Sequence, residues 1–242
     1  MNLNKYYHTT FLKEIGIEGQ KKLLSSKVLV IGAGGLAASS LLYLTSMGVG
    51  HIDIIDDDKV DINNLPRQIV FDEEDVGKYK VDVLKEKLEK KNKDVHINSF
   101  KMRLDVSNAS KTISNYDIVL DFTDNFETKF LVNDICVAKN IPFVMSGVSD
   151  YQGQVMTCIP NKSKDFKSLF SELPINIDEK YKKEDQGVFP LSIGVISDIA
   201  SSEAIKYLLN IGELLLNKMV VINLLTNKYQ IIELPDWKMW RI

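Results

Sequence analysis

Apolar residues along the first part of the chain follow two different spacings. Residues 27–32 (KVLVIG) are almost continuously apolar and rich in β-branched side chains, which is typical of a strand buried on both faces. Residues 77–92 instead place Val81, Leu84 and Leu88 on one face of a helix and charged residues on the other. The two spacings therefore predict strands and helices that follow one another.

This alternation continues to about residue 148. Strands are expected at 27–32, 51–56, 95–102, 116–124 and 141–148, and helices at 17–26, 36–48, 77–92 and 127–140. Regular alternation of this kind predicts an α/β fold of the Rossmann-like, doubly wound class. We expect a mainly parallel sheet with right-handed crossovers and helices on both faces.

The pattern changes after residue 150. Residues 151–160 have the composition of a strand, 195–210 that of a helix, and 218–234 predict an antiparallel C-terminal hairpin. The polar segment 161–187 has no regular period and is long for a connection in a compact domain, which indicates a functional or mobile loop. Because no linker divides the chain, residues 1–242 are expected to form a single domain.

Composition excludes several classes of function. The formal net charge of −3 gives no overall attraction to nucleic acid or to an anionic membrane. No apolar stretch approaches the roughly 20 residues of a membrane span, and the N-terminus lacks the apolar run of a signal peptide. A soluble, cytoplasmic protein is therefore expected. Cys136 and Cys158 lie in apolar segments without a CxxC pair, which predicts buried, inert thiols and neither a zinc site nor a disulfide.

The turn after the first predicted strand carries the first candidate site. Residues 32–37 (GAGGLA) fit the G-x-G-x-x-G/A spacing between a strand and a helix. Gly32 allows the tight turn, and Gly34 lets the backbone approach a phosphate at the start of the helix. Asp56, at the end of the second strand, can accept hydrogen bonds from ribose hydroxyls. The motif indicates an adenine nucleotide but does not choose between NAD and ATP.

Residues beyond Asp56 favour ATP. Candidate ligand-binding residues follow two of the predicted strands and begin one helix: Asp58, Asn64, Arg67, Gln68, Lys80, Asp124 and Asn125. In a doubly wound sheet, ligands bind at the carboxyl ends of the strands. A guanidinium, an ammonium and a carboxylate at that edge suit the triphosphate of ATP and its Mg²⁺, with two cations on phosphate oxygens and one acid on the metal.

Each of the three charged residues also has a plainer explanation. Arg67 can be a surface cation, and Lys80 can be one more solvated lysine. Asp124 can be the N-cap of the helix predicted at 127–140. Their combination at one sheet edge is what favours a nucleotide site.

Several motifs in order and spacing resemble the ThiF/MoeB/HesA family, the bacterial relatives of the ubiquitin-activating enzymes. They include GVGHIDIIDDDKVDINNLPRQ, DIVLDFTDNFETKFLVND and IGVISDIASSEAIKYL, and the resemblance runs from about residue 14 to 234. It implies an enzyme that binds Mg-ATP, adenylates a carboxylate and releases pyrophosphate. The usual acceptor is the C-terminal glycine of a ubiquitin-like sulfur carrier, and some relatives use a peptide or a small-molecule acid. The resemblance also implies a homodimer and a role in biosynthesis, of a cofactor for example.

Roles for individual residues follow from the resemblance. Gly35 would face the phosphates, Asp56 would hold the ribose, Asn64, Arg67 and Lys80 would contact the triphosphate, and Asp124 would bind Mg²⁺ beside Asn125. Arg67, Lys80 and Asp124 are the expected catalytic residues, because adenylation without a covalent enzyme intermediate depends mostly on positioning and charge neutralisation. Segment 161–187 would be the crossover loop that lies over the acceptor's tail.

The chain also departs from the family. His8 stands where many members have an arginine that reaches the ATP of the partner subunit, so His8, Lys5 or Lys13 serves instead or the contact is missing. The cysteine pairs that bind zinc in many members are absent, so no zinc is expected. No cysteine follows Cys158, which argues against a thioester step.

Two alternative functions stay open. An adenylation-inactive member could act as a binding or scaffold subunit, although such a protein has no physical need for Arg67, Lys80 and Asp124 together. An NAD-dependent oxidoreductase could use the same sheet, but the sequence offers no proton-transfer residue for it.

Overall fold

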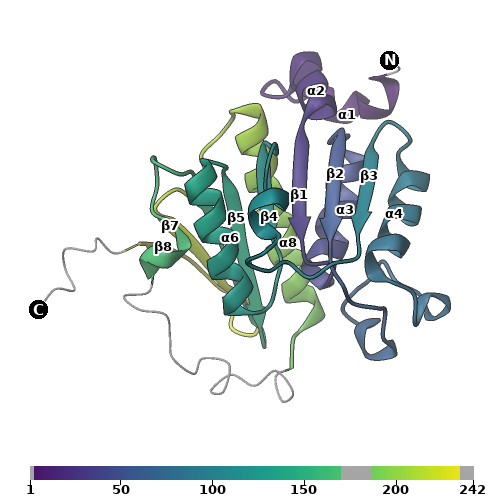
Figure 1. Cartoon of the computed structure of the whole chain (residues 1–242). Helices are drawn as coiled ribbons and strands as arrows, with labels where there is room; N and C mark the ends of the chain where they lie inside the picture. Colours follow the sequence, from purple (N-terminus) through teal and green to yellow (C-terminus); the bar gives the residue numbers. More distant parts are fainter. Residues whose placement is uncertain (1–2, 170–186, 235–242) are drawn as a thin grey trace, which may run out of the picture.

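One sheet organises the chain in the computed structural model, which describes residues 3–169 and 187–234. Its eight strands have the order β3-β2-β1-β4-β5-β6-β7-β8 (Figure 1). The neighbours from β3 to β5 pair in parallel, and the pairs from β5 to β8 are antiparallel. This confirms the mainly parallel sheet with an antiparallel C-terminal hairpin. Most of the expected crossover loop at 161–187 lies outside the described residues.

The elements match the apolar pattern closely. The strands are β1 (Lys27–Ile31), β2 (His51–Ile55), β3 (His96–Phe100), β4 (Ile118–Asp121), β5 (Phe143–Ser149), β6 (Gln152–Cys158), β7 (Lys218–Asn223) and β8 (Lys228–Glu233). The described α-helices are α1 (Tyr7–Thr10), α2 (Gly16–Ser25), α3 (Gly35–Ser46), α4 (Lys80–Lys91), α5 (Ala109–Thr112), α6 (Phe126–Lys139) and α8 (Pro190–Leu209). Every predicted strand and helix is present, and among the described residues only short helices such as α1 and α5 lacked a sequence signal.

Helices cover both faces of the sheet (Figure 1). Val28 and Val30 of β1 join an apolar core with α3, α4 and α8. Leu29 and Ile31 point to the opposite face and pack with apolar residues of α6. All four side chains are buried, which confirms that this strand has no solvent-facing side beyond Lys27.

The strand register brings the ends of β1, β2 and β4 together at one edge of the sheet. Ile31 at the end of β1 pairs with Ile55 at the end of β2 and with Asp121 at the end of β4. Because these strands are parallel, the segments that follow them begin side by side at one edge of the sheet. Those segments contain the glycine turn, the aspartates after β2 and the residues around Asp124.

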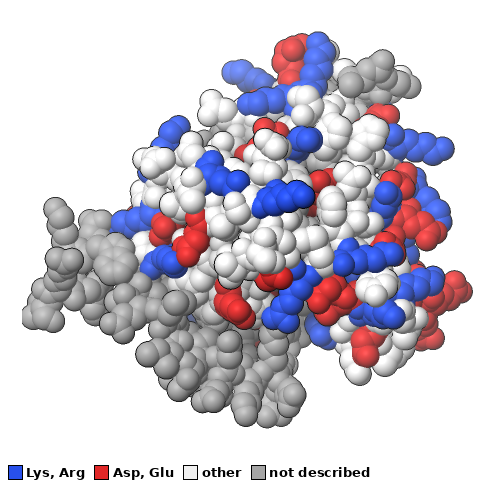
Figure 2. Space-filling model, viewed as in Figure 1, with Lys and Arg blue, Asp and Glu red and all other residues white. Residues whose placement is uncertain are grey.

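The visible surface carries charges of both signs, and the two cysteines are buried as predicted. Basic and acidic side chains are interspersed over the face that Figure 2 presents. No helix within residues 3–169 and 187–234 is long and apolar enough to cross a membrane. Cys136 and Cys158 are buried free thiols. Burial raises the pKa of both thiols well above the usual range, which disfavours the reactive thiolate.

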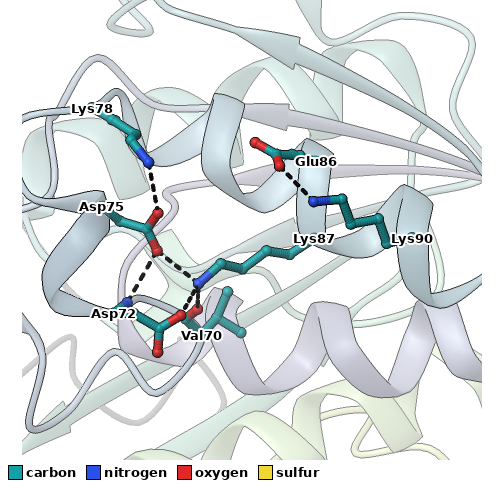
Figure 3. A network of polar contacts seen from close by, with 7 residues as sticks. All are labelled: Val70, Asp72, Asp75, Lys78, Glu86, Lys87 and Lys90. Carbon is teal, nitrogen blue, oxygen red and sulfur yellow. Dashed lines mark hydrogen bonds and ion pairs between the residues drawn. The ribbon is translucent and has the colours of Figure 1, made fainter.

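An ion-pair network ties α4 to the segment after Arg67 (Figure 3). Lys87 Nζ lies 2.5 Å from Asp72 Oδ2 and 2.7 Å from Asp75 Oδ2, and it donates to the Val70 carbonyl at 2.6 Å. Asp75 is buried. Its burial raises the pKa, but hydrogen bonds from Lys87, the Asp72 N–H and Lys78 outweigh that effect and lower it. The network therefore stabilises the fold when the Asp75 carboxyl group is ionised.

Replacing Lys87 with methionine is expected to lower the free energy of unfolding by about 2 kcal/mol, because a buried carboxylate loses its principal charged hydrogen bond. Lys90→Met on the same helix is the matched control. Its exposed pair with Glu86 should contribute much less than the contacts of Lys87, because solvent screens the charges. Urea unfolding at pH 7 measures both. Because the pKa of Asp75 is lowered on folding, the difference should persist at pH 7 and shrink only below the ordinary aspartate range. Equal losses in both variants would contradict this role for Lys87.

Candidate active site

A cavity of about 580 Å³ opens at the carboxyl edge of the parallel strands. Its volume is in the range of small-molecule and cofactor sites. All predicted site residues except Gly35 line it, namely Gly32, Gly34, Asp56, Asp58, Asn64, Arg67, Gln68, Lys80, Asp124 and Asn125. The residues proposed from the sequence thus share one cleft above the glycine turn.

The glycine turn forms the floor of this cavity. Gly32 has a φ of +93°, and a Cβ on it would lie 2.9 Å from the Phe122 carbonyl oxygen, so only glycine fits between β1 and the segment after β4. A Cβ on Gly34 would meet nothing nearer than the Gln68 side chain at 3.8 Å. The backbone at Gly34 is therefore open to the cavity, as the prediction of a phosphate contact requires.

Gly35 is packed more tightly than the other two glycines that the sequence predicts for the site. It does not line the cavity. A Cβ on Gly35 would lie 2.8 Å from the Arg67 carbonyl oxygen and 3.0 Å from Ile193 of α8. The absent side chain lets the segment that carries Arg67 pack closely on α3, so Gly35 has a packing role, and a contact of its backbone with a phosphate stays a prediction.

Asp56 connects the glycine turn to the acidic segment. Its Oδ2 accepts a hydrogen bond from the Ala33 N–H at 2.6 Å, and its Oδ1 accepts one from the Asp58 N–H at 2.7 Å. Each carboxylate oxygen keeps a second lone pair, which a ribose hydroxyl can use. Burial raises the pKa of Asp56, and the two backbone N–H groups and Lys80 only partly oppose this effect.

Lys80 is not a solvated surface lysine. Its side chain is 7% exposed, whereas that of Lys78 is 56% exposed. Its Nζ lies 2.7 Å from Asp58 Oδ2, and its N–H donates to the Asp58 carbonyl at 3.0 Å. Asp58 and Lys80 were expected to contact the ligand separately, and here they form an ion pair. A polyphosphate would have to compete with Asp58 for the ammonium group.

Arg67 is half-buried and comes from a rigid turn. The turn begins at Asp61, whose N–H donates to Asn64 Oδ1 at 3.3 Å and whose side chain accepts from the Asn63 N–H at 2.8 Å. Arg67 Nη1 donates to the Asn63 carbonyl at 2.6 Å. This bond occupies one of the five guanidinium donors and fixes the direction of the side chain beside the cavity. The position of Arg67 beside the cavity favours the ligand-binding prediction over a surface cation.

Asp124 and Asn125 have separate roles. Asn125 is the N-cap of α6, because its Oδ1 accepts a hydrogen bond from the Thr128 N–H at 2.8 Å. The alternative in which Asp124 caps this helix is therefore wrong. Asp124 is exposed and lines the cavity. Its carboxylate is of the ligand type that Mg²⁺ prefers.

Two features of the cavity were missed in the sequence. Arg103, which follows β3, lines it as a further cation. The position of Arg103 just beyond a parallel strand was the available signal.

An acidic cluster is the second missed feature. Carboxylate oxygens of Asp56, Asp57 and Asp58 all lie within 4.8 Å of one another, and no other group of three possible metal ligands occurs among the described residues. Acids and cations around one cavity fit a metal-bound polyphosphate.

The N-terminal residues lie away from this cavity. Lys5 Nζ is 2.7 Å from Asp94 Oδ2 and 2.6 Å from Asn92 Oδ1, which ties it to the segment between α4 and β3. Lys5, His8 and Lys13 are absent from the lining of the cavity. None of them therefore completes the site of its own chain.

Comparison with known proteins gives consistent matches. Residues 6–238 match the ThiF family. The sequence is 37% identical over 215 residues to the SAMP-activating enzyme E1 of Haloferax volcanii, covering 88% of this chain and 78% of that protein. It is 34% identical over 230 residues to a probable molybdopterin-synthase adenylyltransferase of Gracilaria tenuistipitata var. liui, covering 95% of this chain but only 64% of that protein. The crystal structure of Escherichia coli MccB with ATP superposes with a TM-score of 0.85 at 27% identity, covering 96% of this chain and 72% of that one.

Proposed function

This chain belongs to the ThiF family, and we propose that it is an ATP-dependent adenylyltransferase that activates a carboxylate as an acyl adenylate. The observation that carries the proposal is the meeting of Arg67, Lys80 and Asp124 around one cavity above the glycine turn. The two relatives, one named as an activating enzyme and the other as an adenylyltransferase, support it.

The reaction forms one bond and breaks another at the α-phosphorus. An oxygen of the substrate carboxylate attacks this atom, the bond to the bridging α,β-oxygen breaks, and pyrophosphate leaves with the electron pair. Arg67 and Lys80 would neutralise the negative charge that moves onto the leaving group. Asp56 would orient the ribose, and Gly34 leaves room for the phosphates to reach the backbone N–H groups at the start of α3.

Asp124 would hold Mg²⁺. Bound there, the metal would supply positive charge to the phosphate oxygens. Since Lys80 pairs with Asp58, binding of the polyphosphate would replace one anionic partner of this ammonium group with another.

The acceptor is proposed to be a terminal carboxylate. We propose a carrier protein or a peptide as the first choice, as the resemblance implies, and a small-molecule acid as the remaining choice. Similar proteins include a SAMP-activating enzyme and MccB, whose structure is known with MccA. We further propose a homodimer in the cytoplasm. His8, Lys5 or Lys13 of one subunit would then lie near the nucleotide of the other, or this contact is missing. No zinc is expected.

ATP–pyrophosphate exchange tests the function directly. The full chain is assayed with Mg²⁺ and a panel of acids: carrier proteins ending in Gly-Gly, peptides with a free C-terminus, and small carboxylic acids. One of them should stimulate exchange, and the same molecule with an amidated carboxyl group should not. If calorimetry shows ATP binding but no acid stimulates exchange, the result would favour a scaffold subunit. Tighter binding of NAD than of ATP would overturn the nucleotide assignment.

A further inference from the structure

A buried ion pair lies directly behind the turn that carries Asp124. Asp121, the last residue of β4, is fully buried, and Lys129 of α6 is nearly so. Lys129 Nζ lies 3.4 Å from Asp121 Oδ1 and donates to the Ser146 carbonyl of β5 at 2.8 Å. One ammonium group thus joins β4, α6 and β5 just below the edge of the sheet where the cavity opens.

Stability alone does not explain this pair. Taking two charges out of water is expensive, and an apolar pair of similar volume is often at least as stable. The placement is also unfavourable for Lys129, because a cation near the start of α6 opposes the helix dipole. Asp121 Oδ2 and Ser146 Oγ are buried and have no hydrogen-bond partner among the described residues. The pair is therefore incompletely compensated, which favours another purpose for it.

The other contacts of Asp121 show what it holds. Its Oδ1 accepts from the Thr123 N–H at 2.9 Å and from Thr123 Oγ1 at 2.6 Å. Thr123 lines the cavity immediately before Asp124. On the other side of Asp124, the side chain of Asn125 is bonded to the start of α6. The backbone is thus fixed on both sides of the residue that is proposed to bind the metal.

We propose that Asp121 and Lys129 are positioning residues that lock the turn at Thr123 and so present the Asp124 carboxylate to the metal-bound nucleotide. Lys129 supplies a positive charge beside Asp121 from α6 and holds this carboxylate directed at Thr123. This inference rests on the proposed function, since it assumes that Asp124 acts on Mg-ATP. Neither residue lines the cavity, so neither is expected to touch the substrate.

The test uses a double variant that removes both charges without leaving one of them buried alone. Asp121→Leu with Lys129→Met should fold, with an unfolding midpoint in urea near that of the parent, because an apolar pair replaces the ion pair. It should raise the Mg²⁺ concentration for half-maximal exchange by about tenfold, the usual effect of losing a group that orients a metal ligand. ATP affinity measured by calorimetry in EDTA should change less than about twofold, because the glycine turn and Asp56 are untouched.

Two further variants keep the inference testable if the double variant unfolds. Lys129→Arg retains the positive charge, so this variant should have a Mg²⁺ requirement near that of the parent. Thr123→Val removes one of the two hydrogen bonds to Asp121 and should shift the requirement in the same direction by a smaller factor. An unchanged Mg²⁺ requirement in a folded double variant, or in Thr123→Val, would overturn the positioning role.

Calorimetry separates this inference from the function itself. In the parent protein, adding Mg²⁺ should strengthen ATP binding, and the double variant should lose most of that gain. If this happens and no acid supports exchange, the positioning role stands and the proposed reaction fails. If exchange occurs and the gain from Mg²⁺ is equal in both proteins, the reaction stands and the positioning role fails.

Discussion

Replacing Lys80 with methionine is expected to lower the rate of ATP–pyrophosphate exchange by about 100- to 1,000-fold, the usual cost of removing one group that stabilises developing charge. The ammonium group is nearly buried and has a fixed direction, so solvent cannot replace it. The loss should fall mainly on kcat, because the charge on the leaving pyrophosphate is larger in the transition state than in bound ATP.

Lys85→Met is the matched control for this change. Lys85 lies on the same helix, is 39% exposed, and pairs only loosely with Glu89 at 3.8 Å. Its removal should leave exchange within about twofold of the parent, as expected of a surface site outside the cavity. If both variants lost activity equally, the effect would have to come from the helix or from total charge, and Lys80 would not be catalytic. Urea unfolding of both variants shows whether the fold survives.

Replacing Asp124 with asparagine should raise the Mg²⁺ concentration needed for half-maximal exchange by at least about 100-fold, because losing a direct ligand costs no less than losing a group that orients one. The change retains the size of the side chain and removes the charge that Mg²⁺ prefers. Asn125 should continue to cap α6, so the helix and its stability should be unaffected.

The acidic group after β2 provides the competing site for the metal. Asp57 is exposed, lines the cavity and belongs to the cluster with Asp56 and Asp58. If Mg²⁺ is held by Asp124, Asp57→Asn should leave the Mg²⁺ requirement within about threefold of the parent, since only screened charge is lost. The reverse result, a large shift for Asp57→Asn and none for Asp124→Asn, would move the metal to the cluster.

Local rules were enough to predict the elements of the fold. The continuous apolar run of β1 required burial on both faces, and the spacing of Val81, Leu84 and Leu88 required one buried face on α4. The glycine turn was equally local, because a positive φ at Gly32 depends on the missing side chain of that residue. The cavity could be anticipated because parallel strands bring the segments after them to one edge.

The exact role of each site residue depended on neighbours far away in the sequence. The sequence could not show that Lys80 is buried against Asp58, that Gly35 faces the Arg67 carbonyl, or that Arg103 joins the cavity. Asp124 and Asn125 are equally good capping residues by type, and only the position of α6 assigns the cap to Asn125.

By itself, then, the sequence determined which segments are strands and helices and which chemical groups gather at the carboxyl edge, because periodicity and turn chemistry act over a few residues. Only the tertiary structure decided which of those groups contact one another. Pairing across the sheet and packing of helices place side chains within hydrogen-bond distance, and these contacts link residues such as Asp121, Lys129 and Ser146 that belong to three separate elements.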